Sequence, residues 1–229
     1  MTKNHLKRLI VPKTWPIQKK GLVFVTRPEL GAHSRDVSIP ISVLLRQVTG
    51  HAKTLKEVKF ILTNKGVKVD GKKRTSFKYP VGFFDVVTFE EIKENYRIIF
   101  GKNCKLKAIK IDAKEANIKP CKITSKTIIK KGQMQLNLYD GKNICVNDKK
   151  YKVGDSVLLD FEKNEIKDHL PLQKGMTVFF TSGKHMATVG KIEDIEDTTL
   201  VFTVGGNTYR TRKDYAFVIG KDKAAIKLE

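Results

Sequence analysis

The chain has 229 residues and a formal charge of +21, because 45 Lys and Arg residues face only 24 Asp and Glu. At about 100–200 residues per domain, this length allows one large domain or two to three small ones. The 40% hydrophobic content is enough for folded cores and excludes a wholly disordered basic tail. No run reaches the ~18 apolar residues that cross a bilayer. The first 20 residues show no secretory signal, so we expect a cytoplasmic protein.

Ligands of metals and cofactors are too scattered to predict a site. Cys104, Cys121 and Cys145 form neither a disulfide framework nor a Cys-x-x-Cys pair, and we expect small buried thiols in a reducing compartment. The five histidines are equally dispersed. We therefore predict no metal, no cofactor and no small-molecule substrate.

The positive charge is concentrated at one end of the chain. Residues 1–76 hold 17 Lys and Arg against 4 Asp and Glu, whereas the remaining residues hold 28 against 20. Such asymmetry indicates a polyanionic partner for the N-terminal third. A membrane surface would require an amphipathic helix with large apolar anchors, and the sequence contains none. A recognition helix for the DNA major groove is also missing. RNA is the predicted partner.

Residues 1–40 form a basic extension in which Pro and Gly recur too often for a long helix or strand. Its cations are interleaved with Trp15, Phe24 and His33. We expect the cations to neutralise phosphates while the aromatic rings stack or wedge. No acidic residue precedes Glu29, so mutual repulsion should keep the arm mobile until it binds RNA. A merely solubilising tail would have little use for Trp, Phe and Val.

Residues 41–104 predict a small helical module followed by a hairpin. Apolar spacing favours a helix over 41–48, and Thr54 with Glu57 forms a capping box for a second helix. Asp70 and Gly71 then predict a tight hairpin turn. The core of the second helix is expected to contain Leu55, Val58, Ile61 and Leu62.

Two β regions complete the chain. Residues 105–171 alternate in short runs with tight turns, which predicts a central antiparallel β domain. Residues 172–229 repeat the pattern as a small barrel and a short tail. Here a strand, the turn at Gly183 and a second strand containing Gly190 and Lys191 follow the KOW pattern of SH3-like barrels. The overall prediction is an α+β, mostly β, fold.

Two stretches of sequence resemble known RNA-binding proteins. The helices and the "VKVDGK" hairpin resemble the RNA-binding module of bacterial ribosomal protein four. The segments "HLKRL" near the start and "YPVGFFDVV" after the hairpin extend this resemblance. With them, the chain resembles the archaeal and eukaryotic small-subunit ribosomal protein family called "four-e". The resemblance implies an RNA-binding module, a central β domain and a C-terminal KOW barrel. It also implies a structural ribosomal protein that supports subunit assembly and translation, with small-subunit rRNA and neighbouring ribosomal proteins as partners.

Other functions fit the residues less well. A non-ribosomal RNA-binding protein or a KOW-type transcription or translation factor would share the barrel, but the elongation factors lack the basic arm and the segment from Val69 to Val87. An RNA-modifying enzyme such as a pseudouridine synthase would need a catalytic domain, and the chain holds no such domain, nucleophile elbow or phosphate loop. We therefore predict that the chain is not an enzyme.

Candidate RNA-binding residues are the cations of the arm, the module and the barrel turns. They are Lys3, Lys7, Arg8, Lys13, Lys19, Lys20, Arg27, Arg35, Arg46, Lys56, Lys59, Lys72, Lys73, Arg74, Lys184, Lys191, Arg210 and Arg212.

Overall fold

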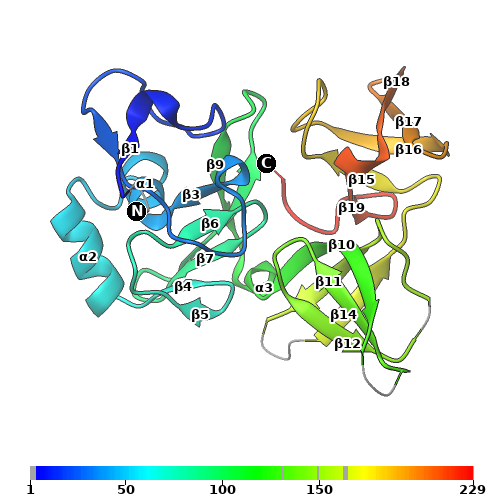
Figure 1. Cartoon of the computed structure of the whole chain (residues 1–229), viewed down its shortest axis with the longest axis horizontal. Coiled ribbons are helices and arrows are strands. Elements are labelled where there is room, and N and C mark those ends of the chain that lie inside the picture. The colour runs from blue at the N-terminus through cyan, green and yellow to red at the C-terminus, as the bar shows by residue number, and fades with distance from the viewer. Residues whose placement is uncertain (1–3, 130–131, 149, 162–164, 229) are drawn as a thin grey trace. The chain divides into compact units, whose positions relative to one another are not determined.

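The computed structural model describes residues 4–129, 132–148, 150–161 and 165–228. Contacts divide the chain after Asn117 into two compact units (Figure 1). Antiparallel sheets dominate both units and the helices are few, which confirms the predicted α+β, mostly β, class.

The first unit is built on one five-stranded antiparallel sheet and two short two-stranded ones. The large sheet has the order β5-β4-β7-β8-β9, and β3 pairs with β6. The predicted turn closes β4 and β5, where Asp70 and Gly71 both have positive φ, the conformation that favours such dipeptides. The strands are β3 (Ser38–Pro40), β4 (Val67–Val69), β5 (Lys72–Lys73), β6 (Pro80–Gly82), β7 (Val86–Phe89), β8 (Glu94–Phe100) and β9 (Leu106–Ile111).

Two helical segments complete the module. The first combines α1 (Ile41–Val43) with a π-helical turn (Leu44–Val48), and its Ile41, Leu44 and Leu45 are fully buried. The second, α2 (Leu55–Asn64), opens with the predicted capping box, in which the Thr54 hydroxyl accepts from the Glu57 amide. Of the predicted core of α2, Val58 and Leu62 are fully buried, whereas Leu55 and Ile61 are half-buried.

The N-terminal arm packs onto the first unit, which differs from the mobile extension that the sequence predicts. Trp15 is only 2% exposed, and its indole Nε1 donates to the Arg35 carbonyl at 3.2 Å. The Leu106 amide donates to the Thr14 carbonyl, so the arm also joins the end of the large sheet. His33 is buried against Asp85, with Nε2 2.9 Å from Oδ1. Trp15 and His33 are therefore core residues and are not free to stack on RNA.

Short elements order the arm along its length (blue in Figure 1). Strand β1 (Leu6–Lys7) pairs with β2 (Phe24–Val25), and a 3₁₀ turn, η1 (Arg8–Ile10), follows β1. A second 3₁₀ turn, η2 (Arg35–Val37), leads into β3.

The boundary between the units lies later than the expected start of the β domain at residue 105. Strand β9 pairs with β8 along its whole length, and α3 (Ala113–Ala116) follows it. The buried Arg97 of β8 contacts Glu115 of α3, with Nη1 3.2 Å from Oε2. Residues 105–117 are therefore part of the first unit. The unit to which a strand belongs depends on the strand it pairs with, and the alternation of residues within the strand does not reveal that partner.

The second unit contains two five-stranded antiparallel sheets. The first sheet has the order β12-β11-β10-β13-β14 and the second has the order β18-β17-β16-β15-β19. The first sheet contains β10 (Ile118–Ile128), β11 (Met134–Leu138), β12 (Asn143–Val146), β13 (Ser156–Asp160) and β14 (Glu165–Leu170). The second contains β15 (Thr177–Phe180), β16 (Val189–Ile195), β17 (Thr199–Val204), β18 (Asn207–Arg212) and β19 (Ala216–Gly220), with a 3₁₀ turn, η5 (Lys213–Tyr215), before β19.

The two sheets of the second unit share a hydrophobic core. Leu158 and Leu170 of the first sheet pack with Val178, Phe180 and other residues of the second. The expected domains 105–171 and 172–229 therefore meet in one compact unit. Gly190 has a packing role there: a Cβ atom would lie 2.7 Å from the Phe202 ring, so the glycine allows β16 to lie close against β17.

Candidate nucleic-acid interface

A group of cations lies on and around α2 and the β4–β5 hairpin of the first unit. We call it the module face. Lys56 and Lys59 are exposed on α2, opposite the buried Val58 and Leu62. Lys72 and Lys73 are exposed on β5 at the turn. The face comprises Lys53, Lys56, Lys59, Lys72, Lys73, Arg74 and Lys78.

Aromatic rings hold several of these cations in place. Lys59 Nζ lies 5.1 Å from the centre of the Phe77 ring, and Lys78 Nζ lies 5.7 Å from the same ring. The guanidinium of Arg74 lies 4.3 Å from the Tyr79 ring. Cations from the helix and from the loop that follows β5 therefore meet beside two aromatic side chains. This restricts their motion while leaving their charge uncompensated.

The positive charge of the module face has few carboxylates near it. Among the described residues, no carboxylate lies within 4.0 Å of a charged nitrogen of any of its seven cations. The nearby Glu57 is the exception: hydrogen bonds from the Lys53 amide and from Thr54, together with the charge of Lys53, lower the pKa of its carboxyl group, so it stays ionised and partly offsets Lys53. Uncompensated cations at close spacing suit the phosphates of a nucleic acid.

The predicted arm cations divide into two groups. Lys7, Lys13, Lys20, Arg27 and Arg35 are exposed, and among the described residues none has a carboxylate at ion-pair distance. Arg8 and Lys19 instead donate to the arm's own backbone, at Gln18 O and Val11 O, each at 3.0 Å. They help to close the arm on itself. Lys3 lies outside the described residues.

Arg46 has a structural role in the first unit. Its side chain is half-buried, and Nε donates to the Lys53 carbonyl at 3.1 Å. It thereby fixes the loop that leads into α2.

Three of the four cations predicted for the barrel have a carboxylate at ion-pair distance. Lys191 Nζ lies 2.9 Å from Asp222, Arg212 lies 2.7 Å from Asp214, and Arg210 lies 3.9 Å from Glu196. Lys184 is exposed at the β15–β16 turn, and no described carboxylate pairs with it. Of the four, Lys184 is therefore the one whose charge no described carboxylate offsets.

Sequence reasoning missed two members of the module face. Lys53 precedes the capping box, and Lys78 lies within the aromatic segment after the hairpin. Its alternation of cations with Phe77 and Tyr79 was a visible signal, since such interleaving is typical of nucleic-acid contacts.

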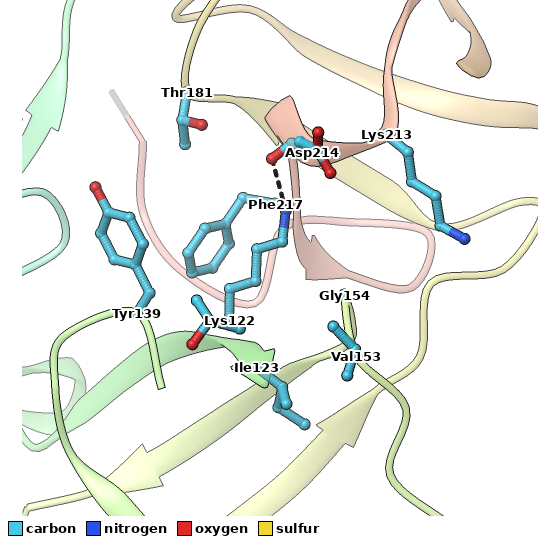
Figure 2. Close-up of a pocket in the computed structure, with 10 residues that line it drawn as sticks. Lys122, Ile123, Tyr139, Val153, Gly154, Thr181, Lys213, Asp214 and Phe217 are labelled. Carbon is cyan, nitrogen blue, oxygen red and sulfur yellow. Dashed lines mark hydrogen bonds between the residues drawn. The ribbon is translucent and has the colours of Figure 1, made fainter. Parts of the chain in front are cut away.

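A cleft of about 410 Å³ lies within the second unit, between the middle of β10 and the segment around η5. Figure 2 shows the Lys122 side chain extending from β10 toward Asp214, alongside Phe217. Lys122 Nζ donates to the Asp214 carbonyl at 2.7 Å and to the Ala216 carbonyl at 2.8 Å. Burial lowers the pKa of its ammonium group to about 8. Lys122 thus links the two sheets and is not available as a surface charge.

Within the described residues, no cluster of three or more His, Cys, Asp or Glu side chains is arranged to hold a metal ion. Among the same residues, no helix is both long enough and apolar enough to cross a membrane.

Comparison with known proteins gives the family. The model of the "Ribosomal family S4e" matches residues 92–166, and the "RS4NT (NUC023) domain" matches residues 2–36. Small ribosomal subunit protein eS4 of Methanocaldococcus jannaschii is 37% identical over 240 residues, covering 99% of this chain and 98% of that protein. The eS4 protein of Methanocella arvoryzae is 39% identical over 233 residues, with 99% and 98% coverage. The chain belongs to the eS4 family.

A solved structure agrees with this membership. The crystal structure of the 30S ribosomal protein S4e from Thermoplasma acidophilum matches with a TM-score of 0.69 and 30% identity, covering 81% of this chain and 95% of that one. The predicted resemblance to the "four-e" family is thereby confirmed. Because eS4 proteins are structural ribosomal components, the prediction that this chain is not an enzyme is also confirmed.

Proposed function

We propose that the chain is a structural constituent of the small ribosomal subunit and binds small-subunit rRNA through the arm and the module face. The names of the eS4 relatives support the ribosomal assignment. In this role the chain supports subunit assembly and translation in the cytoplasm, with rRNA and neighbouring ribosomal proteins as its partners.

The observation that carries the RNA contact is a difference in pairing between the predicted cations of the arm and module face and the predicted cations of the barrel. Exposed Lys and Arg residues of the arm and module face lack described carboxylate partners, whereas three of the four predicted barrel cations have one. A cation that is already paired releases less free energy on meeting a phosphate, because its own carboxylate must first be displaced. The first unit is therefore the main RNA-binding element, and Lys184 is a secondary contact.

A KOW-type transcription or translation factor is the alternative that the barrel alone would allow. The eS4 relatives match 99% of the chain, including the arm and the hairpin. This coverage leaves no region that requires a different function.

Fractionation of cell lysate on a sucrose gradient tests the proposal. We expect the tagged chain to sediment with small ribosomal subunits, and to stay there when the gradient contains 0.5 M salt or more, roughly the range in which weak phosphate contacts are lost. Recovery only at the top of the gradient, at low as well as high salt, would contradict a structural role.

A further inference from the structure

Five large apolar side chains of the arm are exposed on β2 and on the segments next to the β1–β2 pair. Lys7 of β1 pairs with Phe24 of β2, and the Arg8 amide donates to the Val23 carbonyl at 2.8 Å. This pairing brings together two exposed segments, which we call the apolar ridge. Its members are between 52% and 75% exposed: Leu9, Ile10, Leu22, Val23 and Phe24.

Folding of the first unit does not account for this exposure. The arm buries Leu6, Val11, Trp15 and Ile17, so it has apolar residues that serve the core. The ridge residues form two short runs, one between Leu6 and Val11 and one after Ile17, and both remain exposed. A contiguous group of exposed apolar side chains typically marks a binding surface.

Charge around the ridge identifies the kind of partner. Lys7, Lys13, Lys20 and Arg27 are exposed in the same arm, and no Asp or Glu occurs before Glu29. A ridge flanked by cations alone is complementary to a polyanion. RNA supplies phosphates on both sides of each groove and so matches this charge.

We propose that the apolar ridge inserts into the minor groove of an rRNA helix while the flanking cations contact the phosphates on either side. Four of the five residues are aliphatic and cannot stack on a base as an aromatic ring does. They fit riboses and base edges, which the wide, shallow minor groove of A-form RNA displays. Aliphatic and Phe side chains serve as wedges in this way in minor-groove complexes of DNA. The inference rests on the rRNA binding proposed above and names the residues that enter the groove.

Apolar and ionic contacts can be separated by salt. Each phosphate contact steepens the log–log dependence of affinity on salt by about 0.7–0.9. Apolar contacts release no counterions, so removing one should lower the affinity by the same factor at every salt concentration.

The experiment measures binding of the full chain to transcribed small-subunit rRNA of Methanocaldococcus jannaschii between 50 and 400 mM salt. Leu9→Ser and Leu22→Ser should each weaken binding about tenfold, with an unchanged salt slope. Lys20→Gln should instead lower the slope by about 0.7–0.9. Ile128→Ser is the matched control, because Ile128 in the second unit is 76% exposed, and it should bind like the unmodified chain.

Failure of this inference differs from failure of the proposed function. If the unmodified chain binds rRNA with a steep salt slope but both serine variants bind equally well, the ridge does not enter RNA and the inference is wrong. The inference is equally wrong if the serine variants keep rRNA affinity but release a neighbouring protein from purified subunits. If the unmodified chain itself shows no salt-dependent binding, the proposed function fails and the inference with it. Thermal unfolding of each variant checks that the exposed substitutions leave the fold intact.

Discussion

Lys72 and Lys73 show how a single turn determines the charge of a surface. Both follow the Asp70–Gly71 turn, are exposed and have no described carboxylate partner. If each contacts one phosphate, the reversal Lys72→Glu with Lys73→Glu should weaken rRNA binding at 50 mM salt by at least about tenfold per residue. The thermal midpoint should hardly move, as is usual for exposed substitutions.

A matched pair tests whether position matters beyond net charge. Lys152 and Lys167 are exposed in the second unit, and their reversal to Glu changes the net charge equally. We expect a much smaller loss of affinity. Equal losses in the two variants would show that the chain binds RNA by net charge alone.

Leu62 should behave in the opposite way to these lysines. It is fully buried on the inner face of α2, and Leu62→Ala should cost about 2–5 kcal/mol of unfolding free energy. The molecules that remain folded should bind rRNA normally, because no surface charge is lost. Urea unfolding followed by binding below the transition checks both parts. A stable variant with weak RNA binding would show that the two faces of α2 are interchanged.

Because of Lys122, the unfolding free energy of the chain should depend on pH in the alkaline range. Burial lowers its pKa from 10.5 to about 8 in the folded state. Between these values the unfolded chain holds a proton that the folded chain has released, so the unfolding free energy should rise with pH. Because other groups titrate in this range, the measurement is the unfolding free energy of the unmodified chain minus that of Lys122→Met. This difference should increase from pH 8 to 10.5, and a flat or falling difference would refute a lowered pKa.

At the scale of elements, the sequence predicted those features of helices, turns and strands that depend on residues close together in the chain. The capping box of α2 and the turn at Asp70 and Gly71 were readable because each depends on residues at most three positions apart. The strands of the second sheet of the second unit were likewise predictable from alternation and glycine turns. Strand β9 was assigned to the wrong unit, because its partner β8 is chosen by the register of the sheet and by nothing within β9 itself.

The arm was mispredicted for the same reason. Its high Pro and Gly content indicated an extension, but Trp15 reaches the Arg35 carbonyl and Thr14 reaches Leu106, contacts that no local pattern contains. For the candidate site, cationic residue types were predictable, whereas the pairing of Lys191, Arg210 and Arg212 with carboxylates required the fold.

Packing of the arm leads to a prediction about the free protein. Trypsin should cleave slowly after Lys13, Lys19 and Lys20 in the unmodified chain, because the buried Trp15 holds this segment on the first unit. Trp15→Ala should cost about 3–5 kcal/mol locally and expose the same bonds to rapid cleavage. Limited proteolysis with mass analysis of the fragments provides the measurement. Rapid cleavage of the unmodified chain at these sites would show that the arm is mobile, as the sequence predicts, and would contradict its packing on the first unit.

At the scale of the whole molecule, the chain separates two kinds of surface. The first unit carries most of the uncompensated positive charge, while the second unit combines a shared hydrophobic core with largely paired barrel cations. In an eS4 protein this division suits a first unit that binds rRNA and a second unit that presents a more neutral surface. The sequence indicated the charge asymmetry, but only the structure shows which cations are paired.

The most direct test of rRNA binding by the unpaired cations compares two variants of equal net charge. In one, Lys13, Lys20, Arg27, Lys72 and Lys73 become Gln. In the other, the ion-paired Lys65, Lys110, Lys174, Lys191 and Arg212 become Gln. The measured quantity is the log–log salt slope of binding to small-subunit rRNA. The first variant should lose about 0.7–0.9 of slope per residue and the second much less. Equal slopes for both variants would contradict this assignment of the RNA-binding surface.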